Sequence, residues 1–256
     1  MTMLSVAALT VRRSGAELIS GIDLSFGAKG SVALIGPNGA GKTTLLKVLA
    51  GLQPPTAGRA LLDGRDLAAM APAARVRAVG FLPQHFEPHW DLSVAELIDL
   101  GAQRSDRVST KEVTAARTTF ELTGLEHRRW STLSGGERAR VLLAMVLVTD
   151  PPILLADEPA AALDIRHRLD VVRTLADRGR DRLSIVVVHD LDLAFRYFDR
   201  IVLLGRGRIV ADESAATLID DLRLDRAFGV SFERIQTTEG PVLQARATKA
   251  FSLPSG

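Results

Sequence analysis

The stretch from Gly36 to Thr43 has the residue types and spacing that bind the phosphates of a nucleotide. It matches the pattern G-x-x-x-x-G-K-[ST] in full. The glycines allow backbone N–H groups to curl around phosphate oxygens, the lysine supplies positive charge to the outer phosphates, and the threonine hydroxyl can bind Mg²⁺. The predicted phosphate-binding residues are Gly36, Pro37, Asn38, Gly39, Ala40, Gly41, Lys42, Thr43 and Thr44.

A second part of the same site is predicted far downstream, at Asp157 and Glu158. These two residues directly follow the apolar stretch 153–156, which is typical of a buried strand. Carboxylates at the carboxyl end of a parallel strand face the crevice where ligands bind. Asp157 could therefore hold Mg²⁺, and Glu158 could polarise an attacking water as a general base. Alone, such a pair is more typical of a helix cap or a surface turn, but the phosphate loop favours the catalytic interpretation.

The segment Leu133-Ser134-Gly135-Gly136-Glu137 predicts a second anion-binding helix end. Ser134 is a good N-cap, and the glycines leave backbone N–H groups open in front of a long predicted helix. One nucleotide does not need two such ends. Two ends make sense if each serves a different nucleotide, as in a head-to-tail dimer.

The elements that must position these residues alternate between strand and helix. The phosphate loop lies between a predicted strand and a predicted helix over 42–50, which is the context this loop requires. Strands that are apolar throughout and alternate with helices indicate a parallel sheet covered on both faces. The strands predicted for this sheet are Ser31–Ile35, Val79–Leu82, Ile153–Ala156, Ser184–Val188 and Ile201–Leu204.

Two further parts are expected around this sheet. Residues 4–11 and 22–26 predict strands of a small antiparallel sheet, with a polar turn at Ser14-Gly15. From about residue 85 to 150 the chain shows helical segments and no clear strand, including a capping-box pattern at Ser93 and Glu96. We interpret this stretch as a helical insertion. The stretch from about 211 to 256 is a mixed C-terminal extension of the single domain 1–256.

Composition limits the class of protein without naming it. A net charge of +2, with no block of like charge, gives no reason to expect nucleic acid as a partner. The basic stretch 166–182 contains interleaved aspartates, which is typical of a solvated helix face. The absence of cysteine excludes disulfides and thiolate metal sites. We expect no signal peptide, and the longest apolar run, 141–148, is far too short to span a bilayer.

With these motifs the chain resembles the ABC (ATP-binding cassette) ATPases along nearly its whole length. Segment 133–137 resembles the signature of that family, in which Gln is usual at the position of Glu137. The resemblance implies an α/β fold with a P-loop, RecA-like core, a small antiparallel β subdomain and a helical lobe. It also implies ATP and Mg²⁺ as cofactors. In the implied dimer of two copies, Ser134 and Gly136 of one subunit contact the γ-phosphate held by Lys42 of the other.

Three more positions match family motifs. Gln84 matches the Q-loop, which senses Mg²⁺ and water and couples to a membrane partner. Asp164, in the segment 161–164, matches the D-loop, with Ala161 where serine is common. His189 matches the switch histidine, which is implied to hold the γ-phosphate and to orient Glu158. The implied catalytic residues are Lys42, Gln84, Glu158 and His189, and the implied Mg²⁺ ligands are Thr43, Gln84 and Asp157.

The region that should contact the base departs from the family. ABC ATPases often stack adenine on an aromatic residue near the end of the first strand, but residues 11–15 read V-R-R-S-G. Arg13 is the candidate for stacking its planar guanidinium on the base instead.

The resemblance to importers is the more specific one. A free-standing cassette of this length fits an importer subunit, and segments 63–67, 80–84 and 92–98 resemble importers of iron chelates, haem and cobalamin. The implied partners are a polytopic permease and a substrate-binding protein, which would place the chain at the cytoplasmic face of the cell membrane. A zinc or manganese importer, an exporter cassette and a soluble ABC regulator are the alternatives.

A cluster of polar and aromatic residues lies between 85 and 90. His85, Glu87 and His89 could suggest a metal site, but cargo does not pass through the ATPase of an importer, so we do not favour it. Phe86 and Trp90 are better explained as a surface for the permease or as part of the lobe core.

Overall fold

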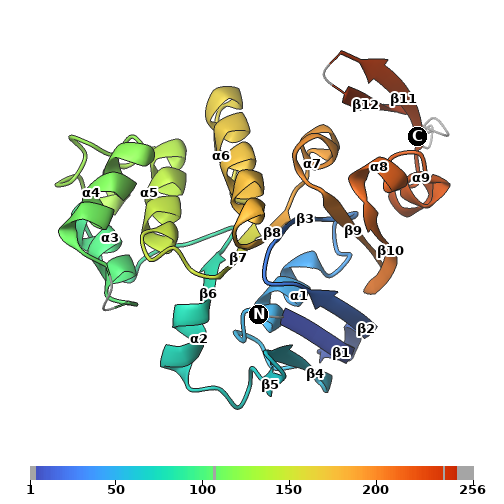
Figure 1. Cartoon of the computed structure of the whole chain (residues 1–256), viewed down its shortest axis with the longest axis horizontal. Helices are drawn as coiled ribbons and strands as arrows, with labels where there is room; N and C mark the ends of the chain where they lie inside the picture. The colour runs from blue at the N-terminus through green and yellow to red at the C-terminus, as the bar shows by residue number, and fades with distance from the viewer. Residues whose placement is uncertain (1–3, 106–107, 239, 247–256) are drawn as a thin grey trace, which may run out of the picture.

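A six-stranded sheet lies at the centre of the molecule and carries the predicted phosphate loop and the Asp157-Glu158 pair on its strands (Figure 1). The computed structural model describes residues 4–105, 108–238 and 240–246. The strand order is β10-β9-β3-β8-β7-β6, with only β10 antiparallel to its neighbour. This confirms the mostly parallel sheet. Its strands are β3 (Gly30–Ile35), β6 (Val79–Leu82), β7 (Ile153–Asp157), β8 (Leu183–Val187), β9 (Arg200–Gly205) and β10 (Arg208–Ser214).

The side chains of each central strand enter two different cores, because successive residues of a strand point to opposite faces. On β3, Val32 and Leu34 join the core that includes helix α1 and the small sheet. Ala33 and Ile35 join the core that includes α6, α7 and the helical lobe. Both faces are covered, which explains why these strands are apolar throughout. The helices outside the lobe are α1 (Lys42–Leu49), α2 (Pro72–Ala78), α6 (Ile165–Asp177), α7 (Leu191–Tyr197), α8 (Ala215–Leu218) and α9 (Leu222–Phe228).

A separate antiparallel sheet packs below the central sheet in Figure 1. It begins as a hairpin whose turn residues Ser14 and Gly15 both have positive φ, 50° and 82°, as tight hairpin turns require. The predicted sheet is confirmed, although its first two strands are longer than expected. Its strands are β1 (Leu4–Arg13), β2 (Ala16–Phe26), β4 (Ala57–Leu62) and β5 (Arg65–Asp66).

Three helices form a lobe beside the sheet, at the left of Figure 1. They are α3 (Val94–Ala102), α4 (Thr110–Thr119) and α5 (Gly135–Leu147). The predicted capping box at Ser93 and Glu96 is present, with the Ser93 N–H donating to the Glu96 carboxylate at 2.7 Å. Helices α3 and α5 cross closely at Gly101, where an added Cβ would lie 2.1 Å from the Met145 carbonyl oxygen.

Several elements were not predicted. Helix α2 buries none of its residues, so it has no apolar stripe to reveal it. The C-terminal extension folds into α8, α9 and a hairpin of β11 (Ser231–Thr237) and β12 (Gly240–Arg246). The hairpin contacts α7, where the Leu243 N–H donates to Asp192 Oδ1 at 2.9 Å.

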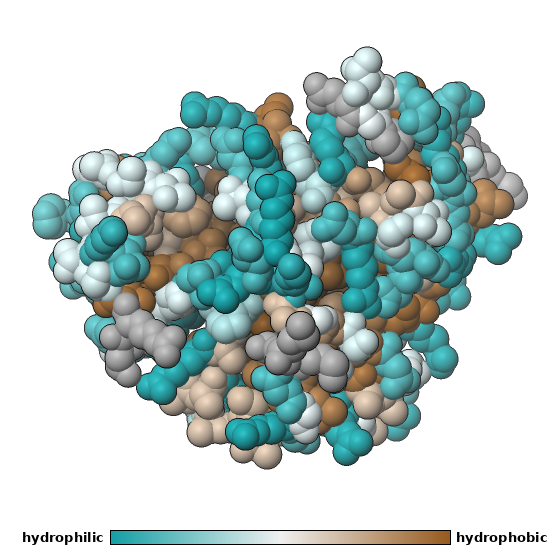
Figure 2. Space-filling view, in the orientation of Figure 1, coloured by the Kyte–Doolittle hydropathy of each residue, from teal (hydrophilic) through white to brown (hydrophobic). Residues whose placement is uncertain are grey.

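The surface is mixed, and Figure 2 shows hydrophilic residues over helix α6 in the middle of this face. Arg166 and Arg173 project from that helix with most of their side chains exposed, as expected for a solvated helix face. None of the helices in the described ranges is long and apolar enough to cross a bilayer.

Candidate functional site

The phosphate loop runs from the end of β3 into α1, and two of its glycines are required by close contacts. Gly36 has φ 145°, and an added Cβ would lie 2.2 Å from the carbonyl oxygen of Leu204 on β9. Gly41 has φ 101°, and its Cβ would lie 2.8 Å from the carbonyl oxygen of Leu18 on β2. Any side chain at either position would push the loop off the two sheets.

Lys42 is folded into this loop. Its Nζ donates to the carbonyl oxygens of Gly36 and Pro37 at 2.8 and 3.1 Å, and the residue is buried. Burial lowers the pKa of Lys42, and the charges of Glu158 and Asp157 oppose this shift. A buried ammonium group within this loop is consistent with the predicted role of Lys42 toward the outer phosphates of a nucleotide.

Asp157, the last residue of β7, has the properties of a cation ligand. Burial raises the pKa of its carboxyl group, and a hydrogen bond with Thr43 opposes that shift. Its Oδ1 atom is buried and has no hydrogen-bond partner among the described residues. A buried, unpartnered carboxylate oxygen beside a threonine hydroxyl is an oxygen donor set of the kind that Mg²⁺ accepts. These residues therefore fit the implied metal.

Glu158 is held at both oxygens by the two residues that were predicted to act with it. Gln84 Nε2 donates to Oε2 at 2.7 Å, and His189 Nε2 lies 2.6 Å from Oε1. Its backbone has φ 51°, in the left-handed region that residues with a side chain rarely adopt. Such strain concentrates at functional sites, where it aims a side chain.

The topology explains why these residues meet. Gln84, Glu158 and His189 each lie one or two residues beyond the ends of β6, β7 and β8, which are neighbours in the sheet. The phosphate loop follows β3, which pairs with β8. Parallel strands bring their carboxyl ends to one edge, so four loops converge there.

Ser134 is the N-cap of α5, as predicted. Its hydroxyl accepts from the Glu137 N–H at 3.3 Å, while the Ser134 N–H donates to the Glu137 carboxylate at 2.7 Å. These hydrogen bonds with Ser134 lower the pKa of Glu137, and Arg128 pairs with the carboxylate at 2.8 Å. Glu fulfils the capping role here as Gln would. In the described structure, Ser134 has no hydrogen bond with the phosphate loop.

Asp164 caps the N-terminus of α6. Its Oδ1 accepts from the His167 N–H at 2.9 Å. The preceding segment lies against the start of α5, because Cβ atoms added at Gly135 and Gly136 would lie 3.7 and 3.8 Å from the side chains of Ala162 and Leu163. Segments 134–136 and 161–164 are therefore neighbours in one chain.

Two predictions from the sequence concern residues that lie apart from this cluster. Arg13 is exposed at the end of β1, and no contact of its side chain bears on base stacking, which stays a prediction. Glu87 accepts a hydrogen bond from Trp130 Nε1 at 2.8 Å and pairs with Arg138 at 3.2 Å. No group of three or more His, Cys, Asp or Glu side chains that could hold a metal occurs in residues 4–105, 108–238 and 240–246.

Comparison with known proteins identifies the family. A family model described as ABC transporter matches residues 19–161, which is more than half of the chain. The chain belongs to the ABC transporter family.

Two relatives of this ABC chain are import proteins by name. The hemin import ATP-binding protein HmuV of Nitrobacter winogradskyi is 37% identical over 254 residues, covering 95% of this chain and 94% of the relative. The cobalamin import ATP-binding protein BtuD of Halobacterium salinarum is 39% identical over 214 residues, covering 80% of this chain and 54% of the relative.

Solved structures confirm the fold of this ABC chain. A bacterial Atm1-family ABC exporter with ATP bound is 29% identical, with a TM-score of 0.78 over 88% of this chain and 41% of the exporter chain. A dimeric ATP-binding cassette bound to ADP and Pi is 24% identical, with a TM-score of 0.76 over 83% of this chain and 98% of the cassette.

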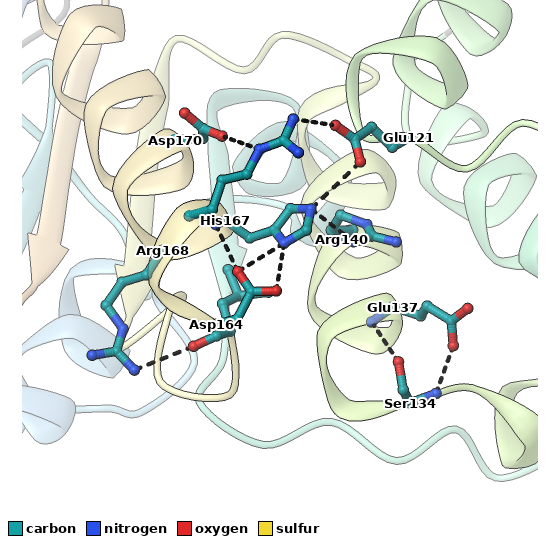
Figure 3. A network of polar contacts seen from close by, with 10 residues as sticks. Glu121, Ser134, Glu137, Arg140, Asp164, His167, Arg168 and Asp170 are labelled. Atoms are coloured by element: carbon teal, nitrogen blue, oxygen red, sulfur yellow. Dashed lines mark hydrogen bonds and ion pairs between the residues drawn. The ribbon is translucent and has the colours of Figure 1, made fainter.

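Sequence reasoning on this ABC chain missed the polar residues around Asp164. Glu121 and Arg140 of the lobe meet His167 of α6 (Figure 3). One signal was available, because Asp164 precedes His167 by three residues, the spacing of a helix cap with a polar residue at its third position. No sequence pattern could have predicted the contacts of His167 with Arg140 and Glu121, since these residues are 27 and 46 positions away from it in the chain.

Proposed function

We propose that this chain is the ATP-binding and ATP-hydrolysing subunit of a membrane importer. The observation that carries this proposal is the clamped carboxylate of Glu158, held by Gln84 and His189 at the sheet edge where Lys42 and Asp157 also lie. The names of the two relatives, which describe ATP-binding proteins for import, support the same conclusion.

The phosphate loop would bind the triphosphate of ATP. Backbone N–H groups of residues 38–44 at the N-terminus of α1 offer donors, whereas Pro37 has none. Lys42 would exchange its two carbonyl acceptors for phosphate oxygens. Thr43, Asp157 and Gln84 would hold Mg²⁺. When bound, this ion supplies positive charge to the phosphate oxygens. Arg13 would stack on the adenine.

Hydrolysis would be directed by Glu158. Its carboxylate would accept a proton from the attacking water as the water oxygen bonds to the γ-phosphorus in line. The bond from that phosphorus to the β–γ bridging oxygen would break at the same time, which releases ADP and phosphate. Gln84 and His189 fix both carboxylate oxygens, which orients the base before the reaction. His189 and Lys42 would then stabilise the charge that develops on the γ-phosphate.

The active unit would be a head-to-tail dimer of two copies. Ser134 and its neighbours Gly135 and Gly136 are on the lobe, away from the phosphate loop of their own chain, and Ser134 and Gly135 are exposed. In a dimer this helix end would serve the nucleotide of the other copy, with Asp164 beside it. The dimeric cassette with a similar fold supports this arrangement.

The dimer would act on a polytopic permease at the cytoplasmic face of the cell membrane. The lobe and Gln84 would transmit closure, and exposed Trp90 offers an aromatic contact for the permease. A substrate-binding protein would deliver the cargo. We assign the cargo to metal chelates of the haem and cobalamin type, because the names of the relatives specify these.

A pull-down of the tagged full chain from gently solubilised membranes tests this proposal. Partners would be identified by mass spectrometry, and a tagged chain from the soluble fraction is the control. We expect a polytopic permease together with a substrate-binding protein. A permease that exports when reconstituted would overturn import, and recovery only from the soluble fraction would overturn the transport assignment.

A further inference from the structure

An ionic network joins the helical lobe to the core, with the His167 ring at its centre (Figure 3). The Nδ1 atom lies 2.9 Å from each carboxylate oxygen of Asp164. The Nε2 atom lies 3.2 Å from Arg140 Nη1 and 3.4 Å from Glu121 Oε2. One ring therefore connects the N-terminus of α6 to α5 and to the loop after α4.

The two sides of the ring reach parts of the chain that are implicated in the proposed dimer. Asp164 ends the segment 161–164, and the Leu163 carbonyl accepts from Arg168 Nη2 at 3.2 Å. Arg140 is in the second turn of α5, the helix that begins beside Ser134. The His167 ring thus bridges segment 161–164 and the helix whose N-terminus carries segment 134–136.

The ring is not needed to cap α6. The backbone N–H of His167 already donates to Asp164 Oδ1 at 2.9 Å, which satisfies the cap. The ring adds a second bond to the same carboxylate and uses its other nitrogen on the lobe. Arg140 is a donor and Glu121 an acceptor, so Nε2 has a partner both with and without its proton.

A second polar link between the lobe and α6, through Arg166, is weaker. Arg166 lies 3.8 Å from Glu121 and 4.0 Å from Asp170, and its side chain is 78% exposed. Exposed ion pairs of this length contribute little. The His167 side chain is 22% exposed and has the shorter contacts. It therefore provides the main polar link in this network between lobe and core.

We infer that His167 is a positioning residue that locks segment 161–164 to helix α5 within one subunit. The two segments that face the other copy in the proposed dimer then move together, so closure of the lobe on the partner's nucleotide also places Asp164. This inference rests on the proposed function, because it needs the ATP-bound dimer. His167 contacts neither ATP nor water in this role.

The test uses two variants that each keep half of the ring's contacts. His167→Asn places an amide near the Nδ1 position and can still bond Asp164, while His167→Gln places one near Nε2 and can still reach the lobe. Both are made in the Glu158→Gln background, where ATP-bound dimers should accumulate. His127→Asn is the matched control, since His127 is an exposed histidine of the helical lobe and is not part of this network.

Light scattering coupled to size exclusion, over a range of ATP concentrations, measures dimer formation. We expect both His167 variants to raise the ATP concentration for half-maximal dimer about tenfold. Binding of a fluorescent ATP analogue to the dilute monomer should stay close to that of the control, because the phosphate loop is untouched. Thermal unfolding at the assay pH verifies that each variant is folded at the temperature of the assay.

Two results would overturn the inference, and they are distinguishable. If His167→Asn dimerises like the control, the ring serves only Asp164, and the link to the lobe has no role. If the Glu158→Gln parent and the control bind ATP but stay monomeric, the proposed dimer fails and the inference fails with it.

Discussion

At the scale of single residues, the buried carboxyl group of Asp157 has a cost in folding stability. Burial in the sheet edge, with Glu158 close by, raises its pKa above the ordinary value of 3.8. A carboxyl group with a raised pKa is less stable ionised in the folded chain than in the unfolded chain. Its charge therefore lowers the free energy of unfolding at every pH above the folded pKa, and a bound cation would offset that loss.

Asp157→Asn is expected to stabilise the nucleotide-free chain at neutral pH by about 1 kcal/mol. The substitution removes a buried charge and keeps an oxygen that can accept from Thr43. Urea unfolding measures the gain, and Mg²⁺-dependent ATP hydrolysis should be lost. Asp99→Asn, at an exposed position on α3, is the control. A variant that is less stable than wild type, or that still hydrolyses ATP with Mg²⁺, would contradict this interpretation.

At the scale of elements, the helical lobe depends on how closely α3 and α5 approach. Gly101 is in α3, where glycine is unfavourable by about 1 kcal/mol relative to alanine. The position is buried, and a Cβ there would meet the backbone of Met145 at 2.1 Å for the oxygen and 2.8 Å for the carbonyl carbon. Packing therefore outweighs helix propensity at this residue.

Gly101→Ala should lower the free energy of unfolding by about 2 kcal/mol, because the two helices must separate. Chemical denaturation measures the change. Gly27→Ala is the control, since a Cβ at that position would meet only the Lys29 carbonyl oxygen, at 3.7 Å. If the Gly101 variant is as stable as wild type or more stable, helix propensity has a larger effect at this position than the packing of α3 against α5.

The contacts of His167 between lobe and core predict that the free energy of unfolding depends on pH. Hydrogen bonds with Asp164 and Glu121 raise the pKa of His167 above 6.5, and the nearby charge of Arg140 opposes the shift. A base with a raised pKa stabilises the fold fully below its unfolded pKa, and the stabilisation is lost as pH rises through the folded pKa.

The wild-type chain should therefore lose unfolding free energy from about pH 6.5 upward relative to His167→Asn, which lacks the ionisable ring. Urea denaturation of both chains at several pH values gives the difference. His127→Asn tests whether any histidine produces the effect. Parallel stability profiles for wild type and His167→Asn across this range would disprove the pKa shift.

The sequence predicts those parts of the site whose residue types are fixed by the local backbone. Gly36 and Gly41 must be glycines because two strands approach them closely, and Glu158 can be located because it follows an apolar strand. The five parallel strands of the central sheet were predictable because they are apolar throughout, whereas its antiparallel edge strand β10 was not predicted. Helix α2 and the C-terminal hairpin were not, because one buries nothing and the other gains its place from contacts with α7. The His167 network depends on how two helices pack, which no short pattern encodes.

At the scale of the whole molecule, the proposed dimer requires each chain to contribute halves of two different sites. The sheet edge gathers the phosphate loop, Asp157, Glu158, Gln84 and His189 from neighbouring strands. The lobe presents the N-terminus of α5 with no hydrogen bond from Ser134 to that loop in the described part of the chain. Two copies placed head to tail would complete both sites, which would give each of the two predicted anion-binding helix ends its own nucleotide.

The most direct test of this arrangement compares wild type with Glu158→Gln in one assay of ATP turnover and oligomeric state. Loss of the general base should reduce turnover about 100-fold or more. The variant should still bind ATP and should accumulate as a dimer, while wild type hydrolyses its ATP and returns to monomer. Glu126→Gln in the lobe is the control. Near-normal turnover by Glu158→Gln would remove Glu158 from the base role, and a variant that binds ATP but stays monomeric would contradict the shared site.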